Sequence, residues 1–97
     1  MVTRAQLNEL SFDHIVEFKY DRTIFACAKV NGNGHTRIFL VFEDGKGRVY
    51  SRNGRADSWE RVEGELADDI KYRINAARQR VPIYILNGEH NEGPLHN

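Results

Sequence analysis

Two turn signals enclose an apolar run in the stretch Asn31-Gly32-Asn33-Gly34-His35-Thr36-Arg37-Ile38-Phe39-Leu40-Val41-Phe42-Glu43-Asp44-Gly45. Asparagine and glycine accept positive φ at little cost, so the first four residues predict a tight hairpin and Asp44-Gly45 predicts a second one. The run of five apolar residues between them is typical of a central strand. The stretch therefore predicts a sheet made of antiparallel hairpins.

The segments on either side of this stretch extend the predicted sheet. Residues 12–20 mostly alternate apolar and polar side chains, which favours a strand. Ile15 departs from the alternation, so a helix through residues 12–20 remains the alternative. A turn at Asp21-Arg22 leads to an expected strand over residues 23–30, and residues 48–52 follow the second hairpin. Together these segments predict a four-stranded antiparallel meander.

Two helices are expected beside the sheet. Thr3 and Gln6 have the spacing of a capping box and predict a short helix over residues 4–10. Asp57 and Glu60 repeat that spacing at the start of a long C-terminal amphipathic helix of about six turns, in which Gly64 marks a weak point. Its apolar stripe is Trp59, Val62, Leu66, Ile70, Ile74, Ala77 and Val81.

Pro82 ends the long helix in this prediction, because proline lacks the N–H that a helix interior needs. A short fifth strand over residues 83–86 is a further option in this prediction. Residues 87–97 are polar, contain glycine and proline, and are expected to form a flexible tail. The fold class is therefore α+β, with residues 1–86 as a single domain and the long helix packed on one face of the sheet.

Composition narrows the classes of function. The 97 residues include 14 basic and 14 acidic side chains, a balance that argues against a dedicated non-specific nucleic-acid binder. A single cysteine excludes an internal disulfide and favours a cytoplasmic setting. No apolar run reaches the roughly 18 residues of a membrane helix. We expect no cofactor, no membrane contact and no metal, since the potential tail ligands Glu89, His90, Glu92 and His96 lack the spacing of a strong site.

The predicted turns fix the register of the sheet and so its two faces. They pair Val16 with Cys27, Cys27 with Ile38, and Leu40 with Val49. One face is then apolar and is expected to take the long helix: Phe12, Val16, Phe18, Phe25, Cys27, Ile38, Leu40, Phe42 and Val49. The other face is expected to be open: Ile15, Glu17, Lys19, Ile24, Ala26, Ala28, Val30, His35, Arg37, Phe39, Val41, Arg48, Tyr50 and Arg52.

The basic and aromatic half of this expected open face supplies the candidate functional residues. Arg37 and Arg52 are expected directly opposite each other, an arrangement that an anionic group would stabilise. Arg55 extends the basic stretch after the second hairpin, and Tyr72 falls on the side of the long helix away from its apolar stripe. The candidate binding residues are Arg37, Phe39, Val41, Arg48, Tyr50, Arg52, Arg55 and Tyr72.

These residues predict a small non-enzymatic protein-interaction or regulatory module, of the inhibitor or adaptor type, which binds a protein partner (a second copy or a different protein) through the open face. One alternative is a nucleic-acid-binding domain in which Phe39 and Tyr50 stack on bases and the arginines meet phosphates. Another is a face covered by the N-terminal helix and tail. The last alternative is an enzyme of unknown type in which His14 activates Cys27 on the expected core face.

Overall fold

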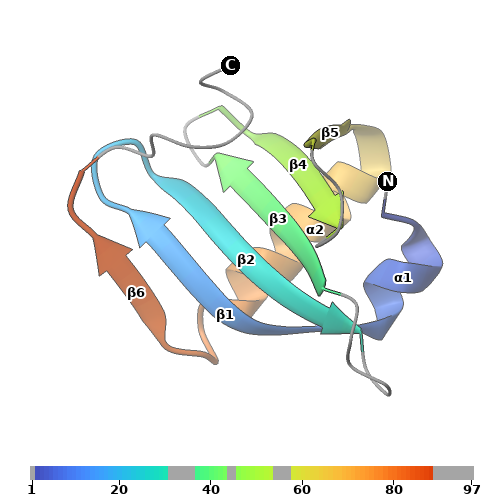
Figure 1. Cartoon of the computed structure of the whole chain (residues 1–97), viewed down its shortest axis with the longest axis horizontal. Helices are drawn as coiled ribbons and strands as arrows, with labels where there is room; N and C mark the ends of the chain where they lie inside the picture. The colour runs from blue at the N-terminus through green and yellow to red at the C-terminus, as the bar shows by residue number, and fades with distance from the viewer. Residues whose placement is uncertain (1, 31–36, 44–45, 54–57, 89–97) are drawn as a thin grey trace.

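The computed structural model describes residues 2–30, 37–43, 46–53 and 58–88, and it leaves the side chains of residues 27–30, 37–41, 43 and 53 undescribed. The elements follow in the order α1 (Arg4–Glu9), β1 (Leu10–Phe18), β2 (Thr23–Val30), β3 (Arg37–Glu43), β4 (Arg48–Asn53), β5 (Glu60–Val62), α2 (Gly64–Ala77) and β6 (Ile83–Leu86). Within these residues, two helices and one six-stranded sheet form the α+β fold. Figure 1 shows α2 lying across one face of the sheet.

The sheet has the strand order β5-β4-β3-β2-β1-β6. Strands β1 to β5 pair antiparallel with their neighbours, whereas β6 pairs parallel with β1. The prediction of a four-stranded antiparallel meander is therefore wrong in strand number and in the direction of one edge strand, whereas the additional short strand allowed over residues 83–86 is present as β6. The reason is that α2 acts as a crossover, which returns the chain to the far edge in the direction of β1. Most of the segment 12–20 lies in β1, as its alternation of apolar and polar side chains predicts.

The short N-terminal helix is confirmed together with its capping box. The Gln6 N–H donates to Thr3 Oγ1 at 3.1 Å, and the Thr3 N–H donates to Gln6 Oε1 at 2.9 Å. Leu7 is buried and belongs to the hydrophobic core, so α1 is anchored by packing as well as by its cap.

The long C-terminal helix is shorter than predicted, because α2 begins at Gly64 and ends at Ala77. The residues expected to form its first turn, Glu60–Val62, form β5 instead, and the predicted N-cap Asp57 lies outside the described residues. Gly64 has φ +72°, a conformation that glycine adopts without strain, and it lets the chain turn from β5 into the helix. Trp59, Val62 and Val81 of the predicted stripe therefore lie outside the helix.

The core lies between α2 and one face of the sheet. Side chains of α2 pack there against β1, β2, β4 and β5 and against residues from β3 and the N-terminal segment. The described core residues are Val2, Leu7, Leu10, Ile15, Ile24, Ala26, Phe42, Val49, Val62, Ala67, Ile70, Ile74 and Ala77. Ile15, Ile24 and Ala26 were expected on the open face, so the predicted faces are inverted in β2 and in β1 after the irregularity between Phe12 and His14; Phe12 itself packs against the core as predicted.

The inversion comes from one hairpin. Position Cys27 pairs with Phe39 and not with Ile38 as predicted, a shift of one residue. Side chains alternate between the two faces of a sheet along each strand. A shift of one residue between β2 and β3 therefore exchanges the predicted faces on the β2 side of this hairpin relative to those on the β3 side.

The two other hairpins shift by an even number of residues and keep their faces. Val16 pairs with Phe25, and Phe42 pairs with Val49. Phe42 and Val49 are accordingly buried, as predicted.

Candidate functional site

One face of the sheet points away from α2 and is referred to below as the open face. Ile15 and Ile24 are buried against the helix, so their strand neighbours Val16 and Phe25 point to the other side. Figure 1 is viewed from this side, with the sheet in front of α2. In the described ranges, the half-buried or exposed side chains on the open face include His14, Val16, Phe18, Phe25, Arg48, Tyr50, Arg52, Trp59, Arg61, Tyr84 and Leu86.

Three aromatic rings contact one another in series on the open face. The ring centroids of Phe18 and Phe25 are 5.7 Å apart with their planes at 70°. Those of Phe25 and Trp59 are 6.1 Å apart with their planes at 56°. The guanidinium carbon of Arg52 lies 5.0 Å from the centroid of the Trp59 ring, within cation–π range. These four residues are called the aromatic cluster below.

Strand β5 brings Trp59 to this cluster. The register pairs Ser51 with Glu60, so the next positions along the two strands, Arg52 and Trp59, are neighbours on the same side of the sheet. Sequence reasoning missed this role, because Trp59 also has helical spacing to the apolar residues that follow it. The positive φ available to Gly64 was the signal that separates Trp59 from the helix.

The predicted site residues on β3 and β4 do lie on the open face. Arg37, Phe39 and Val41 are placed there by their register positions, and Arg48, Tyr50 and Arg52 have half-buried side chains on β4. Their neighbours differ from the prediction. Arg37 pairs with Lys29, and Arg52 pairs with Phe39, so the expected pairing of Arg37 with Arg52 is wrong. Phe18 and Phe25 were assigned to the core and are part of the open face instead.

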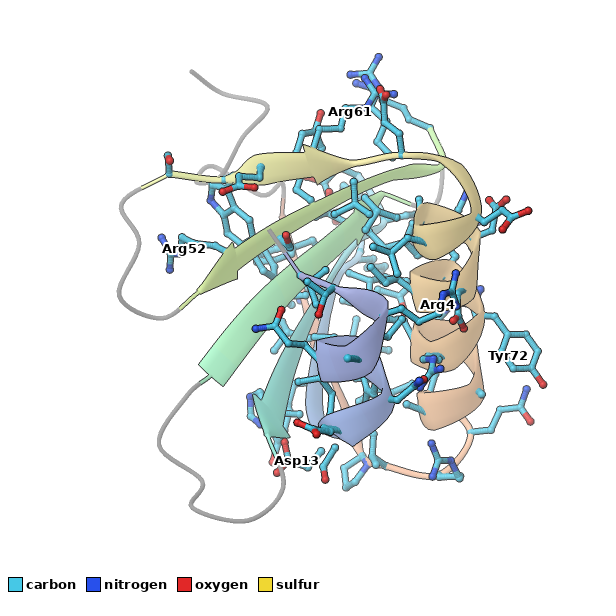
Figure 2. All side chains as sticks on the ribbon, turned by 90° about the vertical axis from the view of Figure 1, so that its right-hand side faces the viewer. Arg4, Asp13, Arg52, Arg61 and Tyr72 are labelled. Carbon is cyan, nitrogen blue, oxygen red and sulfur yellow. The ribbon has the colours of Figure 1, made fainter. Side chains whose placement is uncertain are left out.

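The two remaining candidate residues do not join this face. Arg55 lies outside the described residues. Tyr72 projects from the outer side of α2 and is 74% exposed. Figure 2 shows Tyr72 and Arg52 on opposite sides of the molecule. Tyr72 is therefore part of a different surface.

Tyr72 borders a groove of about 550 Å³ between β1 and α2. Its lining is Leu10, Ser11, Phe12, Asp69, Tyr72, Arg73, Ala76 and Arg80. Two of the charged side chains in this groove already bind each other, since Arg73 Nε donates to Asp69 Oδ1 at 2.9 Å.

The two residues of this ion pair also bind α1 and so attach it to α2. The Arg73 guanidinium also donates to the Leu7 carbonyl at 3.3 Å and to Asn8 Oδ1 at 2.7 Å, and Arg4 donates to Asp69 Oδ2 at 2.6 Å. Hydrogen bonding from Arg73 holds the pKa of Asp69 below its ordinary value of 3.8; the positive charges of Arg73 and Arg4 lower it further, while partial burial opposes them. Figure 2 shows α1 beside α2 with Arg4 near this contact. These groups have a structural task, the attachment of α1 to α2.

His14 and Cys27, the residues of the enzyme alternative, are direct register partners and not diagonal neighbours as predicted. Their positions belong to the open face and not to the core. The His14 ring is exposed and packs on Tyr84, with ring centroids 5.3 Å apart. The imidazole is therefore part of an aromatic contact between β1 and β6.

The residues that the structure describes include no group of three His, Cys, Asp or Glu side chains able to hold a metal ion. In the same residues, no helix has the length and apolar character needed to cross a membrane. Comparisons with protein-family models, with curated proteins and with solved structures found no match.

Proposed function

We propose that this protein is a non-enzymatic interaction module which binds a protein partner through the open face, as an inhibitor or adaptor does. The observation that carries the proposal is the aromatic cluster on the side of the sheet away from α2. An antiparallel sheet face that meets water is normally mostly polar. Here Phe18, Phe25 and Trp59 are half-buried on that face. A contiguous apolar area of this kind is typical of a contact surface.

The residue types favour a protein as the partner. Tryptophan, tyrosine and arginine are the types most enriched at binding hot spots, and the open face has Tyr50 and Arg52 on β4 and Trp59 directly before the adjacent β5. Arg52 and Phe25 hold Trp59 in place before binding, so less side-chain entropy is lost when a partner docks. The cluster is thus an ordered anchor.

The ring geometry argues against nucleic acid. Base stacking needs an open ring face parallel to the base. The Phe18–Phe25 and Phe25–Trp59 planes are inclined at 70° and 56°, and the guanidinium of Arg52 lies over the Trp59 ring. The balance of 14 basic and 14 acidic residues also provides no general attraction to phosphate.

The charges beside the cluster define the partner's chemistry. Arg48, Arg52 and Arg61 lie along β4 and β5, and Glu43 is the acidic register partner of Arg48. The Arg61 charge is already shared with Glu63 at 3.2 Å. Because these side chains are arginines, a segment that combines aromatic or aliphatic side chains with aspartate or glutamate complements this face best.

Trp59 gives a direct readout, because it is the one tryptophan in the chain. The experiment selects peptides from a random display library on the immobilised whole chain, then titrates synthetic versions while following tryptophan fluorescence. We expect peptides with apolar and acidic residues, which bind Arg52→Glu at least about tenfold more weakly. Tyr72→Ala, on the opposite side, is the matched control and should bind as the parent does.

Two results would contradict the proposal. The first is a set of selected peptides whose affinity is unchanged by Arg52→Glu and by Phe25→Ala, with circular dichroism confirming that both variants are folded. The second is a saturable fluorescence change with a mixed-sequence single-stranded oligonucleotide that weakens as salt rises, which would favour the nucleic-acid alternative.

A further inference from the structure

The two edges of the sheet differ in their chemistry. Strand β5 has three residues, two of which are Glu60 and Arg61, and a short charged edge resists pairing with another strand. Strand β6 is Ile83-Tyr84-Ile85-Leu86 and has no charge. Tyr84, Ile85 and Leu86 are 55%, 64% and 46% exposed. Among the described residues, the β6 strand therefore has no charged side chain that would oppose pairing with a further strand.

The main chain of β6 offers hydrogen-bonding groups at regular spacing on its outer side. The Lys19 N–H donates to the Leu86 carbonyl at 2.9 Å, so Leu86 faces β1. Along a strand, the N–H and C=O of one residue point to the same side and alternate from residue to residue. Tyr84 therefore also faces β1, and the main-chain groups of Ile83 and Ile85 point outward. In the described part of the chain, no strand lies on that side.

We propose that the β6 edge pairs antiparallel with the β6 edge of a second copy of this chain, independently of the function proposed above. A two-fold axis at Tyr84 places Ile83 of one copy opposite Ile85 of the other. The two N–H and two C=O groups that each copy presents outward are then all used, in four hydrogen bonds. The strand is thus complementary to itself, which is the requirement of a two-fold interface.

The side chains and charges suit the same pairing. On the α2 side of the sheet, Ile83 and Ile85 of each copy become cross-strand neighbours, which covers the exposed Ile85. Beside them, Glu17 is already paired with Arg78 at 2.6 Å. The net charge of zero means that two copies do not repel each other at long range.

This assembly has a geometrical consequence for the open face. A two-fold axis perpendicular to the sheet keeps each face on its own side, so both helices α2 lie behind one continuous sheet. The two aromatic clusters then face the same direction on the front. A bivalent partner would meet two anchors at a fixed spacing, which raises its avidity without new contacts.

The test measures oligomeric state by sedimentation equilibrium on the whole chain, from about 10 µM to about 1 mM. We expect a monomer–dimer equilibrium in the parent protein. Ile85→Pro removes one outward N–H and spares the ladder to β1, so it should raise the dissociation constant about tenfold or more while circular dichroism stays native. Ile85→Lys, which places a charge at the edge, is the second variant in case proline perturbs the strand. Tyr72→Lys is the matched control, exposed on α2, and should leave the dimer intact.

Amide hydrogen exchange adds a residue-level readout. We expect the amides of Ile83 and Ile85 to exchange quickly in dilute protein and slowly in concentrated protein, whereas Leu86 is protected at both concentrations. A parent protein that stays monomeric throughout the range overturns the proposal. So does a dimer that survives both Ile85 variants. Because no partner peptide is needed, this failure is distinct from failure of the open-face proposal, for which Arg52→Glu is the diagnostic variant and should still dimerise.

Discussion

Replacement of Arg73 by alanine should loosen the attachment of α1. This side chain makes an ion pair with Asp69 and donates to the Leu7 carbonyl and to Asn8 Oδ1. It is 30% exposed, so each contribution lies at the low end of its range. The ion pair contributes about 0.5 kcal/mol, and each of the two contacts to α1 contributes about 0.5–1 kcal/mol. We therefore expect Arg73→Ala to lower the free energy of unfolding by about 2 kcal/mol, and the melting temperature by about 10 °C.

The assay is urea and thermal unfolding of the whole chain, followed by circular dichroism at neutral pH. Lys71→Ala is the matched control, because Lys71 is on the same helix and pairs with Asp68, which is 76% exposed, at 3.2 Å. That variant should lose less than about 0.5 kcal/mol. A double-mutant cycle of Arg73→Ala with Asn8→Ala should give a coupling energy of about 0.5–1 kcal/mol. Equal losses for Arg73→Ala and Lys71→Ala, with no coupling to Asn8, would refute the assignment of Arg73 as the attachment of α1.

Three further variants test other parts of the fold. The pKa of Asp69 is lower in the folded chain than its ordinary value of 3.8. Its carboxylate therefore contributes stability that is fully present above that value and is lost as the pH falls through the folded-state pKa. Urea unfolding at pH 7 and in acid should show that the stability of Asp69→Asn depends less on pH than that of the parent protein. Gly64→Ala meets no atom within 4 Å but must adopt φ +72°, so thermal melts should show a loss of about 1 kcal/mol, with Gly64→Asn less affected. Glu17→Ala leaves the Arg78 guanidinium three-quarters buried without its partner at 2.6 Å, and chemical denaturation should show that it costs more stability than the double variant Glu17→Ala with Arg78→Met.

Local signals in the sequence predicted local structure well. The Thr3 and Gln6 capping box predicts α1, because both hydrogen bonds form within a single turn and need no tertiary contact. The segment before α2 shows the opposite case. Trp59 and Val62 fit helical spacing, yet β5 forms there, since pairing with β4 and the backbone of Gly64 outweigh a spacing that both structures can satisfy.

The faces of the sheet depended on a single loop length. Asn31-Gly32-Asn33-Gly34 offers the dipeptide Asn-Gly twice, so the sequence does not fix which register follows. The observed pairing of Lys29 with Arg37 differs by one residue from the predicted one and exchanges the faces of β2, and of β1 from His14 onward, relative to α2.

Part of the candidate site could therefore be predicted from the sequence. Tyr50 and Arg52 are on the open face as expected, because β3 and β4 were correctly oriented toward α2. Phe18 and Phe25 were assigned to the core, since apolar side chains alone do not say which side of a sheet a helix covers. Only the register distinguishes Phe25 from its buried neighbour Ile24.

The parallel pairing of β6 with β1 has a consequence for folding. Ile15 pairs with Ile83, which comes 68 positions later in the chain, whereas β1 to β5 join neighbours along the sequence. Closing such a long loop costs more chain entropy than forming a hairpin, so we expect the β1–β6 contact to form late in folding. During synthesis, the β1 residues that pair with β6, Ile15 to Phe18, have an unpaired outer edge until β6 leaves the ribosome. Strand β6 follows the other strands that the structure describes, so a chain that stops before residue 83 would leave this part of the β1 edge open to aggregation.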